Sequence, residues 1–288
     1  MIFIYFIFFE CNHSFPPIPF LPPTHLRNRP LLFISPPPLC STAIGIKCRD
    51  GIVLAVEKPQ VSKMLVAGSN RRVFGLDSHA GIAVTGLSAD GRQLVNRARE
   101  ESQSYSNSYG SKIIPTVLAN RIALYMHYFT LHASLRPFGS SALIAAYDED
   151  LKTPELYMVE PSGVCFRYFG CAAGKGAPAA KTELEKVMAK YSDAQGVASI
   201  SVREAVTEVA KILYLIRDVS KDRPFELELG WLCEESKNEF ALVPKDLVEA
   251  ADAAAKAAVV GSAGEGSGSA SASATASATA SASTPMDM

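Results

Sequence analysis

Cysteines are few in this 288-residue chain, and their spacing does not suggest a metal site. The six of them are scattered, with no C-x-x-C motif, at Cys11, Cys40, Cys48, Cys165, Cys171 and Cys233. Zinc sites typically combine closely spaced cysteine pairs with histidines. The sequence therefore predicts free thiols in a reducing compartment, and neither a metal nor another cofactor.

An excess of charge of either sign is also missing. The 28 lysines and arginines balance 29 aspartates and glutamates, which leaves a formal net charge of −1 at pH 7. Nucleic acids and anionic membrane surfaces attract strongly basic proteins. The apolar run at residues 1–9 is shorter than the roughly 20 residues that span a bilayer. We therefore expect neither nucleic acid nor a membrane as a partner.

Residues 1–40 differ in composition from the rest of the chain. They are rich in Phe, Leu, Ser and Pro, and lack the basic start and small-residue cleavage site of a signal peptide. Because pyrimidine-rich codons encode these four residues, one hypothesis is a translated intron end in place of the true first exon. A polyproline II ligand for SH3-like domains is a weaker alternative. We expect this leader to be disordered or a gene-model artefact.

The stretch from Ser41 to Lys58 predicts a β-hairpin. Asp50-Gly51 favours a tight turn, because glycine tolerates the positive φ that such turns require. The return strand, residues 52–56, is apolar throughout, which is typical of a strand that is buried on both faces. We expect the whole fold to begin with this hairpin.

The remaining pattern predicts one layered domain at residues 41–258. Glycine punctuation and β-branched content predict strands near Val61 and at 71–76, 81–86, 141–147, 155–159, 164–168, 225–232 and 239–242. Apolar spacing and cap residues predict helices that begin near Ala89, Pro115 and Pro244 and that span 179–191 and 202–216. This order indicates an α/β/β/α four-layer sandwich, with two stacked, mainly antiparallel sheets between helix pairs. The Gly/Ser/Ala/Thr-rich residues 259–288 cannot bury a core, and we expect them to be disordered.

The run STAIGIKCRDGIVLAVEK at residues 41–58 resembles the opening hairpin of 20S proteasome subunits, which have the N-terminal-nucleophile hydrolase fold. Later segments resemble the alpha-type members of that family, above all alpha type-3, the seventh ring member. These segments are Asn70–Phe74, Gly86–Asp90, Arg136–Gly139, Pro161–Gly163, Gly170–Lys175, Ala179–Lys186, Phe225–Leu229 and Val243–Asp246. The resemblance covers about residues 41–250 and does not extend to the atypical N-terminus.

The resemblance also implies a nucleophile position, but the residues of this chain at that site differ from those that catalysis requires. Catalytic beta-type subunits use an N-terminal threonine whose own amine is the base, helped by a lysine. The matching positions here are Ser41, Glu57 and Arg72, and Cys40 stands where beta-type precursors have their cleaved glycine. Arginine cannot share protons as that lysine does. We therefore predict an inactive site; the alternative is an active hydrolase that uses Ser41 after a maturation cut.

Two further motifs have competing interpretations. Arg72 matches a lysine that in some alpha subunits receives the C-terminal carboxylate of an activator, but a structural ion pair is an equal alternative. The run Gly170–Lys175 lacks one residue of the phosphate-loop spacing, so close backbone packing at a strand-to-helix turn is favoured.

As a whole, the resemblance implies a non-catalytic alpha subunit of the 20S core particle. Such a subunit scaffolds ring assembly, forms the substrate entrance and docks regulatory particles for ubiquitin-dependent protein degradation. Its expected partners are other alpha subunits in a heteroheptameric ring, beta-ring subunits, and regulatory particles or activators. Its expected locations are the cytoplasm and the nucleus.

Overall fold

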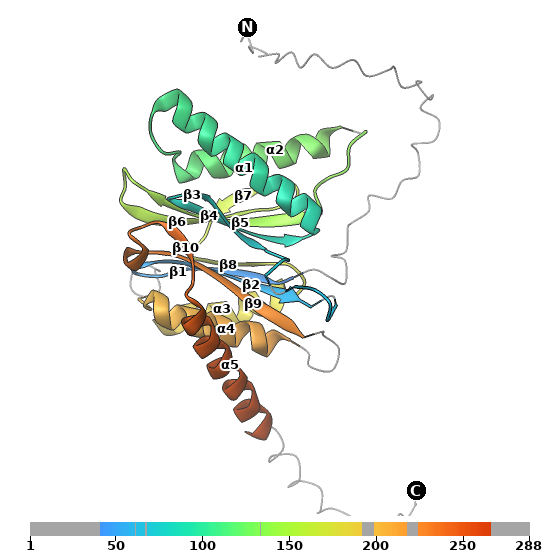
Figure 1. Ribbon diagram of the computed structural model, residues 1–288, viewed down its shortest axis with the longest axis vertical. Coiled ribbons are helices and arrows are strands. Elements are labelled where there is room, and N and C mark those ends of the chain that lie inside the picture. Colours follow the sequence, from blue (N-terminus) through green and yellow to red (C-terminus); the bar gives the residue numbers. More distant parts are fainter. Residues whose placement is uncertain are drawn as a thin grey trace, which may run out of the picture. The chain divides into compact units, whose positions relative to one another are not determined.

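Two five-stranded antiparallel sheets are stacked face to face, and helices cover the outer side of each (Figure 1). The computed structural model describes residues 41–60, 62–66, 68–132, 134–191, 199–217 and 224–265. In spatial order, the first sheet contains β10 (Phe240–Leu242), β9 (Phe225–Cys233), β2 (Gly51–Pro59), β1 (Ala43–Lys47) and β8 (Gly170–Ala173). The second contains β3 (Val73–Asp77), β4 (Ala80–Gly86), β5 (Ser140–Asp148), β6 (Thr153–Val159) and β7 (Cys165–Arg167).

The helices form the two outer layers. Helices α1 (Ser88–Tyr109) and α2 (Pro115–Leu131) pack on the second sheet. Helices α3 (Ala177–Tyr191), α4 (Val202–Ile216) and α5 (Lys245–Glu265) pack on the first. This arrangement confirms the predicted α/β/β/α sandwich.

Strand β2 shows how one sequence serves two interfaces. Ile52, Leu54 and Val56 lie in the cluster between the two sheets. Val53 and Ala55 alternate with them and lie in the cluster under α3 and α4. All five are fully buried, so the prediction of a strand buried on both faces is confirmed.

The reason given for Gly51 was wrong, although the hairpin itself is confirmed. Gly51 does not have a positive φ, so the turn does not depend on the left-handed region. A Cβ at this position would instead lie 2.1 Å from the carbonyl oxygen of Leu232. The position therefore requires glycine because β9 passes very close to the start of β2.

Two strand assignments differ from the sequence prediction. Residues 62–66 form a turn and a bend, so no separate strand follows β2 there; Val61 itself lies outside the described residues. Strand β8 was missed, since its short, small-residue sequence GCAA carries little β-propensity. β8 is stabilised by pairing with β1, from Ala43 opposite Ala173 to Ile46 opposite Gly170.

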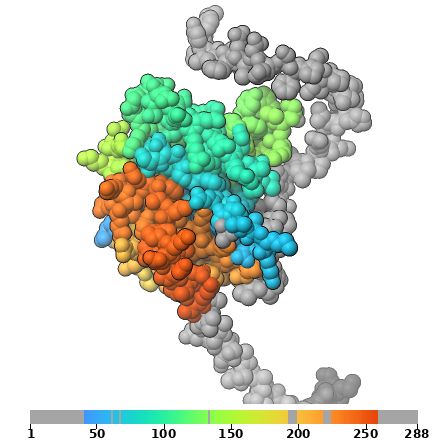
Figure 2. Space-filling view, in the orientation of Figure 1, coloured from blue at the N-terminus to red at the C-terminus, as the bar shows by residue number. Residues whose placement is uncertain are grey.

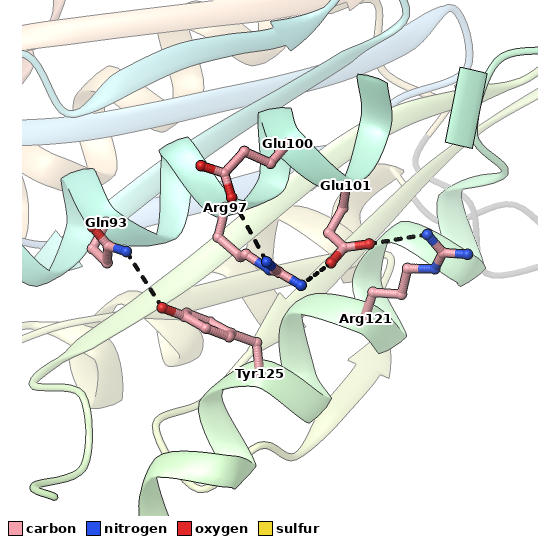
Figure 3. A network of polar contacts seen from close by, with 6 residues as sticks. All are labelled: Gln93, Arg97, Glu100, Glu101, Arg121 and Tyr125. Carbon is pink, nitrogen blue, oxygen red and sulfur yellow. Dashed lines mark hydrogen bonds and ion pairs between the residues drawn. The ribbon is translucent and has the colours of Figure 1, made fainter. Parts of the chain in front are cut away.

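Side chains from both α1 and α2 form a polar network (Figure 3). Glu101 accepts hydrogen bonds from Arg97 of its own helix and from Arg121 of α2, the latter at 2.9 Å. The guanidinium of Arg97 also lies over the ring of Tyr125, 5.2 Å from its centroid. These contacts hold the two helices together on their polar sides, opposite the apolar residues that cover the sheet.

Helix α4 begins as the sequence predicted. The Ser201 hydroxyl accepts a hydrogen bond from the amide of Glu204 at 3.4 Å, which is one half of the expected capping box. Helix α5 starts at Lys245 and keeps a helical backbone to Glu265, beyond the expected domain end at residue 258. The remaining predicted tail, residues 266–288, and the leader, residues 1–40, lie outside the described residues.

The C-terminal strands lie against the second sheet on one face of the molecule. In the space-filling view, the orange C-terminal residues meet the cyan residues of the β3 and β4 region (Figure 2). There the Phe240 ring lies so close to Gly81 that a Cβ would be 2.2 Å from it. Within the described residues, no helix is both long and apolar enough to cross a membrane.

Candidate functional site

Ser41 lies fully buried just before β1, in contact with the end of β4. Its hydroxyl donates to Oγ1 of Thr85 at 3.3 Å, and the Thr85 hydroxyl donates to the Ser41 carbonyl oxygen. Thr85 is itself buried. The two residues thus form a closed pair of hydroxyls that links the first sheet to the second.

The turn after β8 closes over this pair. Gly174 has a φ of +105°, and a Cβ on it would lie 2.1 Å from the Ser41 carbonyl oxygen and 2.8 Å from Thr85 Oγ1. Two residues later, the amide of Gly176 donates to Thr42 Oγ1 at 3.2 Å. The glycines of this segment allow the backbone to approach Ser41 and Thr42, which supports the packing role over a phosphate loop.

Arg72 lies beside the same end of β4. Its side chain donates from Nη1 to the carbonyl oxygen of Gly86 at 2.8 Å, and its residue is only 5% exposed. Its amide donates to the carboxylate of Glu228 at 2.8 Å. Gly86 follows Thr85, so Arg72 and Ser41 are each bonded to one of two consecutive residues.

Glu57 completes the set of predicted positions. Its amide donates to the carbonyl oxygen of Thr42 at 2.9 Å, next to Ser41. Its residue is half-buried near the end of β2. The structure therefore brings Ser41, Glu57 and Arg72, the three positions that the resemblance implied, to the same end of the stacked sheets.

The chemistry of this arrangement is limited by the groups around Ser41. In the described part of the chain, Thr85 is the side chain to which the Ser41 hydroxyl is bonded, and an alcohol is no base at neutral pH. Arg72 cannot accept a proton either, because guanidinium stays charged in proteins. A buried serine without a proton acceptor is a poor nucleophile.

The sequence analysis missed a cluster of charged side chains beside Arg72. Lys58 Nζ lies 3.3 Å from the carboxylate of Glu226 and 3.9 Å from that of Glu228. Burial raises the pKa of Glu228, against the amide hydrogen bonds from Arg72 and Val73 and the charge of Lys58. The sequence contains one signal for this cluster. Glu226 and Glu228 alternate with apolar residues in β9, and Lys58 lies on the partner strand β2.

Two of the motifs quoted for the family resemblance contact each other. The Asp90 carboxylate accepts two hydrogen bonds from the Arg136 guanidinium, both at 2.7 Å, and a third from the amide of Gly139 at 2.8 Å. The side-chain hydrogen bond from Arg136 is the main cause that lowers the pKa of Asp90. These contacts therefore fix the start of α1 to the segment before β5.

The cysteines and histidines of the described residues have structural positions. Burial raises the pKa of Cys48 and Cys171 to about 12 and that of the half-buried Cys165 to about 11, so these thiols are poor nucleophiles. His79 is buried, with Nε2 2.9 Å from the carbonyl oxygen of Ile113. No three potential metal ligands cluster together among the residues for which coordinates are described.

Comparison with known proteins places this geometry in a class. The family model described as "Proteasome subunit" matches residues 39–232. The proteasome subunit alpha type-3 of Arabidopsis thaliana is 50% identical over 218 residues, which are 76% of this chain and 84% of that protein. The chain belongs to the proteasome subunit family, whose members share the four-layer N-terminal-nucleophile hydrolase sandwich.

Its relatives are alpha-type members of that family. The alpha type-3 subunit of Oryza sativa subsp. japonica is 51% identical over 218 residues, 76% of this chain and 84% of that protein. The "probable proteasome subunit alpha type-7" of Schizosaccharomyces pombe is 43% identical over 216 residues, 75% of this chain and 81% of that protein. The predicted alpha-type identity is therefore confirmed, since these alpha type-3 proteins are about 50% identical to this chain over the aligned residues.

Proposed function

We propose that this chain is a non-catalytic alpha subunit of the 20S proteasome core particle. The observation that carries the proposal is the buried Ser41–Thr85 pair: the hydroxyl at the nucleophile position is closed in, and no base among the described residues is bonded to it. The half-identity to alpha type-3 proteins supports the same conclusion. Substrate proteins would be cleaved by beta-type threonines elsewhere in the particle.

The proposed role is to support assembly of the particle and to control the access of substrates to it. An alpha subunit contacts neighbouring alpha subunits in a heteroheptameric ring and beta-ring subunits beneath it. It contributes to the substrate entrance and presents surfaces to regulatory particles during ubiquitin-dependent protein degradation. We propose these partners, and a location in the cytoplasm and nucleus, on the strength of the family relationship.

The contribution of Arg72 to an activator pocket stays a prediction. Its guanidinium is bonded to the Gly86 carbonyl oxygen and its residue is almost fully buried. Those contacts are typical of a group that stabilises the end of β4. An Arg72→Met variant that assembles but loses stimulation by an activator peptide would support the activator role.

The active-hydrolase alternative can be tested directly. Core particle purified with a Ser41→Ala variant of this chain should hydrolyse fluorogenic peptides as fast as the wild-type particle, because Ser41 performs no chemistry. A threonine-protease inhibitor is the control that abolishes activity in both preparations. Loss of one peptidase activity in the variant, or a wild-type chain whose intact mass begins at Ser41, would overturn the non-catalytic assignment.

A further inference from the structure

A cavity of about 500 Å³ lies between the two sheets, at the end of β1 that is farther from Ser41. Lys47 at the end of β1 lines one side of it. Glu155 of β6 and Arg167 of β7 line another. A volume of this size is typical of sites for small organic ligands, which occupy roughly 300–1,000 Å³.

The charges around the cavity do not cancel. Glu155 is buried, and both of its carboxylate oxygens are engaged, one by Arg167 Nη1 at 2.6 Å and one by the Tyr157 hydroxyl at 2.7 Å. Lys47 Nζ makes neither an ion pair nor a hydrogen bond with any residue whose position the structure describes. The cavity therefore has two cations and one neutralised carboxylate, and its excess charge is the ammonium of Lys47.

Lys47 has the properties of a cation that lacks a counterion. Its burial lowers the pKa of the ammonium, the charge of Glu155 opposes this effect, and the charge of Arg167 adds to it. A half-buried ammonium is stabilised when a carboxylate approaches within ion-pair distance. An anion in the cavity would supply the partner that Glu155, held by Arg167, does not.

Apart from Thr153, the rest of the lining is apolar or aromatic. Tyr168 and Phe169 join β7 to β8, and Leu151 lies in the turn between β5 and β6. Phe169 is 46% exposed and Leu151 is 65% exposed, so both offer free apolar surface beside the cation. A ligand that combines an anionic group with an aromatic or aliphatic group matches both parts of this wall.

We propose that this cavity binds apolar monocarboxylates, with the carboxylate paired to Lys47 and the apolar group against Phe169 and Leu151. Arg167 and Glu155 act as positioning residues, because their ion pair keeps the Glu155 carboxylate away from Lys47. The ligand is either a free organic acid or an acidic side chain that is preceded by an aromatic residue in a protein segment. The site shares no lining residue with the Ser41 pair.

Titration calorimetry on the full-length chain tests the proposal with 3-phenylpropionate as the probe. We expect saturable binding that weakens about tenfold or more in Lys47→Met, which keeps the aliphatic stem, and that returns in Lys47→Arg. The neutral probe 3-phenylpropanamide should bind about tenfold more weakly than the acid to the wild-type chain. Lys190→Met, which removes an exposed lysine outside the cavity, is the matched control and should bind as the wild type does.

A blocked phenylalanyl-glutamate dipeptide amide distinguishes the two sources of the carboxylate. Tighter binding of the free acid assigns the cavity to a small molecule, and tighter binding of the dipeptide assigns it to a protein segment; both outcomes support the site. Absence of saturable binding by either probe overturns it. Equal affinity of the wild-type chain and Lys47→Met, or of the acid and the amide, overturns it as well.

Discussion

At the scale of single residues, Gly174 controls how closely the turn after β8 approaches Ser41. Alanine at this position would have a strained φ of +105° and a Cβ 2.1 Å from the Ser41 carbonyl oxygen. At Gly110, φ is +71° and a Cβ would meet nothing within 4 Å, so Gly110→Ala should cost only the roughly 1–2 kcal/mol of left-handed strain. We expect Gly174→Ala to lower the free energy of unfolding by about 1–3 kcal/mol more than this, because of the clash.

Urea unfolding of the two alanine variants beside the wild type measures that difference. Equal losses in the two variants would mean that the backbone moves away at Gly174 without cost. The close contact over Ser41 would then not be a structural constraint.

Asp90 gives a residue-scale prediction that depends on pH. Its pKa in the folded chain lies below the ordinary value of 3.8, first because of the hydrogen bonds from Arg136. A lowered pKa contributes stability that is present above the unfolded pKa and is lost as the pH falls through the folded pKa. Asp90→Asn should therefore cost about 1–3 kcal/mol at pH 7, with a smaller difference from the wild type below about pH 3.

Chemical denaturation at several pH values between neutral and acid measures this convergence. Asp246→Asn, at an exposed first-turn position of α5, is the control and should change stability by less than about 0.5 kcal/mol at pH 7. A constant difference between Asp90→Asn and the wild type at every pH would contradict the ion-pair explanation.

Single residues also show where sequence reasoning reached its limit. Asp50-Gly51 marked the correct turn, but its glycine is required by the nearby backbone of Leu232, a contact from a strand some 180 residues later. Ser41, Glu57 and Arg72 were identified from the resemblance alone, and their role at the nucleophile position stays a prediction. The partner Thr85 was missed, because nothing in its local sequence indicates which residue it will face.

At the scale of elements, the pairing of α1 with α2 depends on Glu101. Its side chain is 15% exposed and is bonded to Arg97 and Arg121 (Figure 3). Glu101→Gln should lower the free energy of unfolding by about 1–2 kcal/mol, since two charge-assisted hydrogen bonds weaken at once.

Glu100→Gln is the matched control for that measurement. Glu100 is 68% exposed and lies 3.7 Å from Arg97, so its loss should cost less than about 0.5 kcal/mol. Denaturant unfolding compares the two variants. Similar values for both would show that the network adds nothing beyond an ordinary surface ion pair.

The elements that sequence patterns predicted are those with a long, continuous signal. Helix α4 has a cap residue and an apolar face, and β2 has an apolar run, so both were located within a few residues. Strand β8 has four small residues and depends on β1 to become a strand, so its local sequence could not reveal it. Val61, on which another predicted strand was centred, lies outside the described residues, and the following residues 62–66 form a turn and a bend.

At the scale of the whole molecule, the layer order followed from the order of strands and helices along the chain. The order of the strands within each sheet could not be predicted in this way. Strand β9, near the end of the domain, pairs with β2 near its start, and β10 pairs with β9. The cavity beside Lys47 likewise depends on this long-range packing, because its lining comes from both sheets. Long-range pairing thus separates what the sequence predicts from what requires the structure.

The central claim is that this chain works as a structural alpha subunit inside a 20S particle. The most direct test is native mass spectrometry of the complex that purifies with a C-terminally tagged form of the chain. The account predicts a particle that also contains other alpha-type and beta-type subunits, in which this chain is not cut before Ser41. A tagged chain that purifies without other proteasome subunits, or that begins at Ser41, would contradict it.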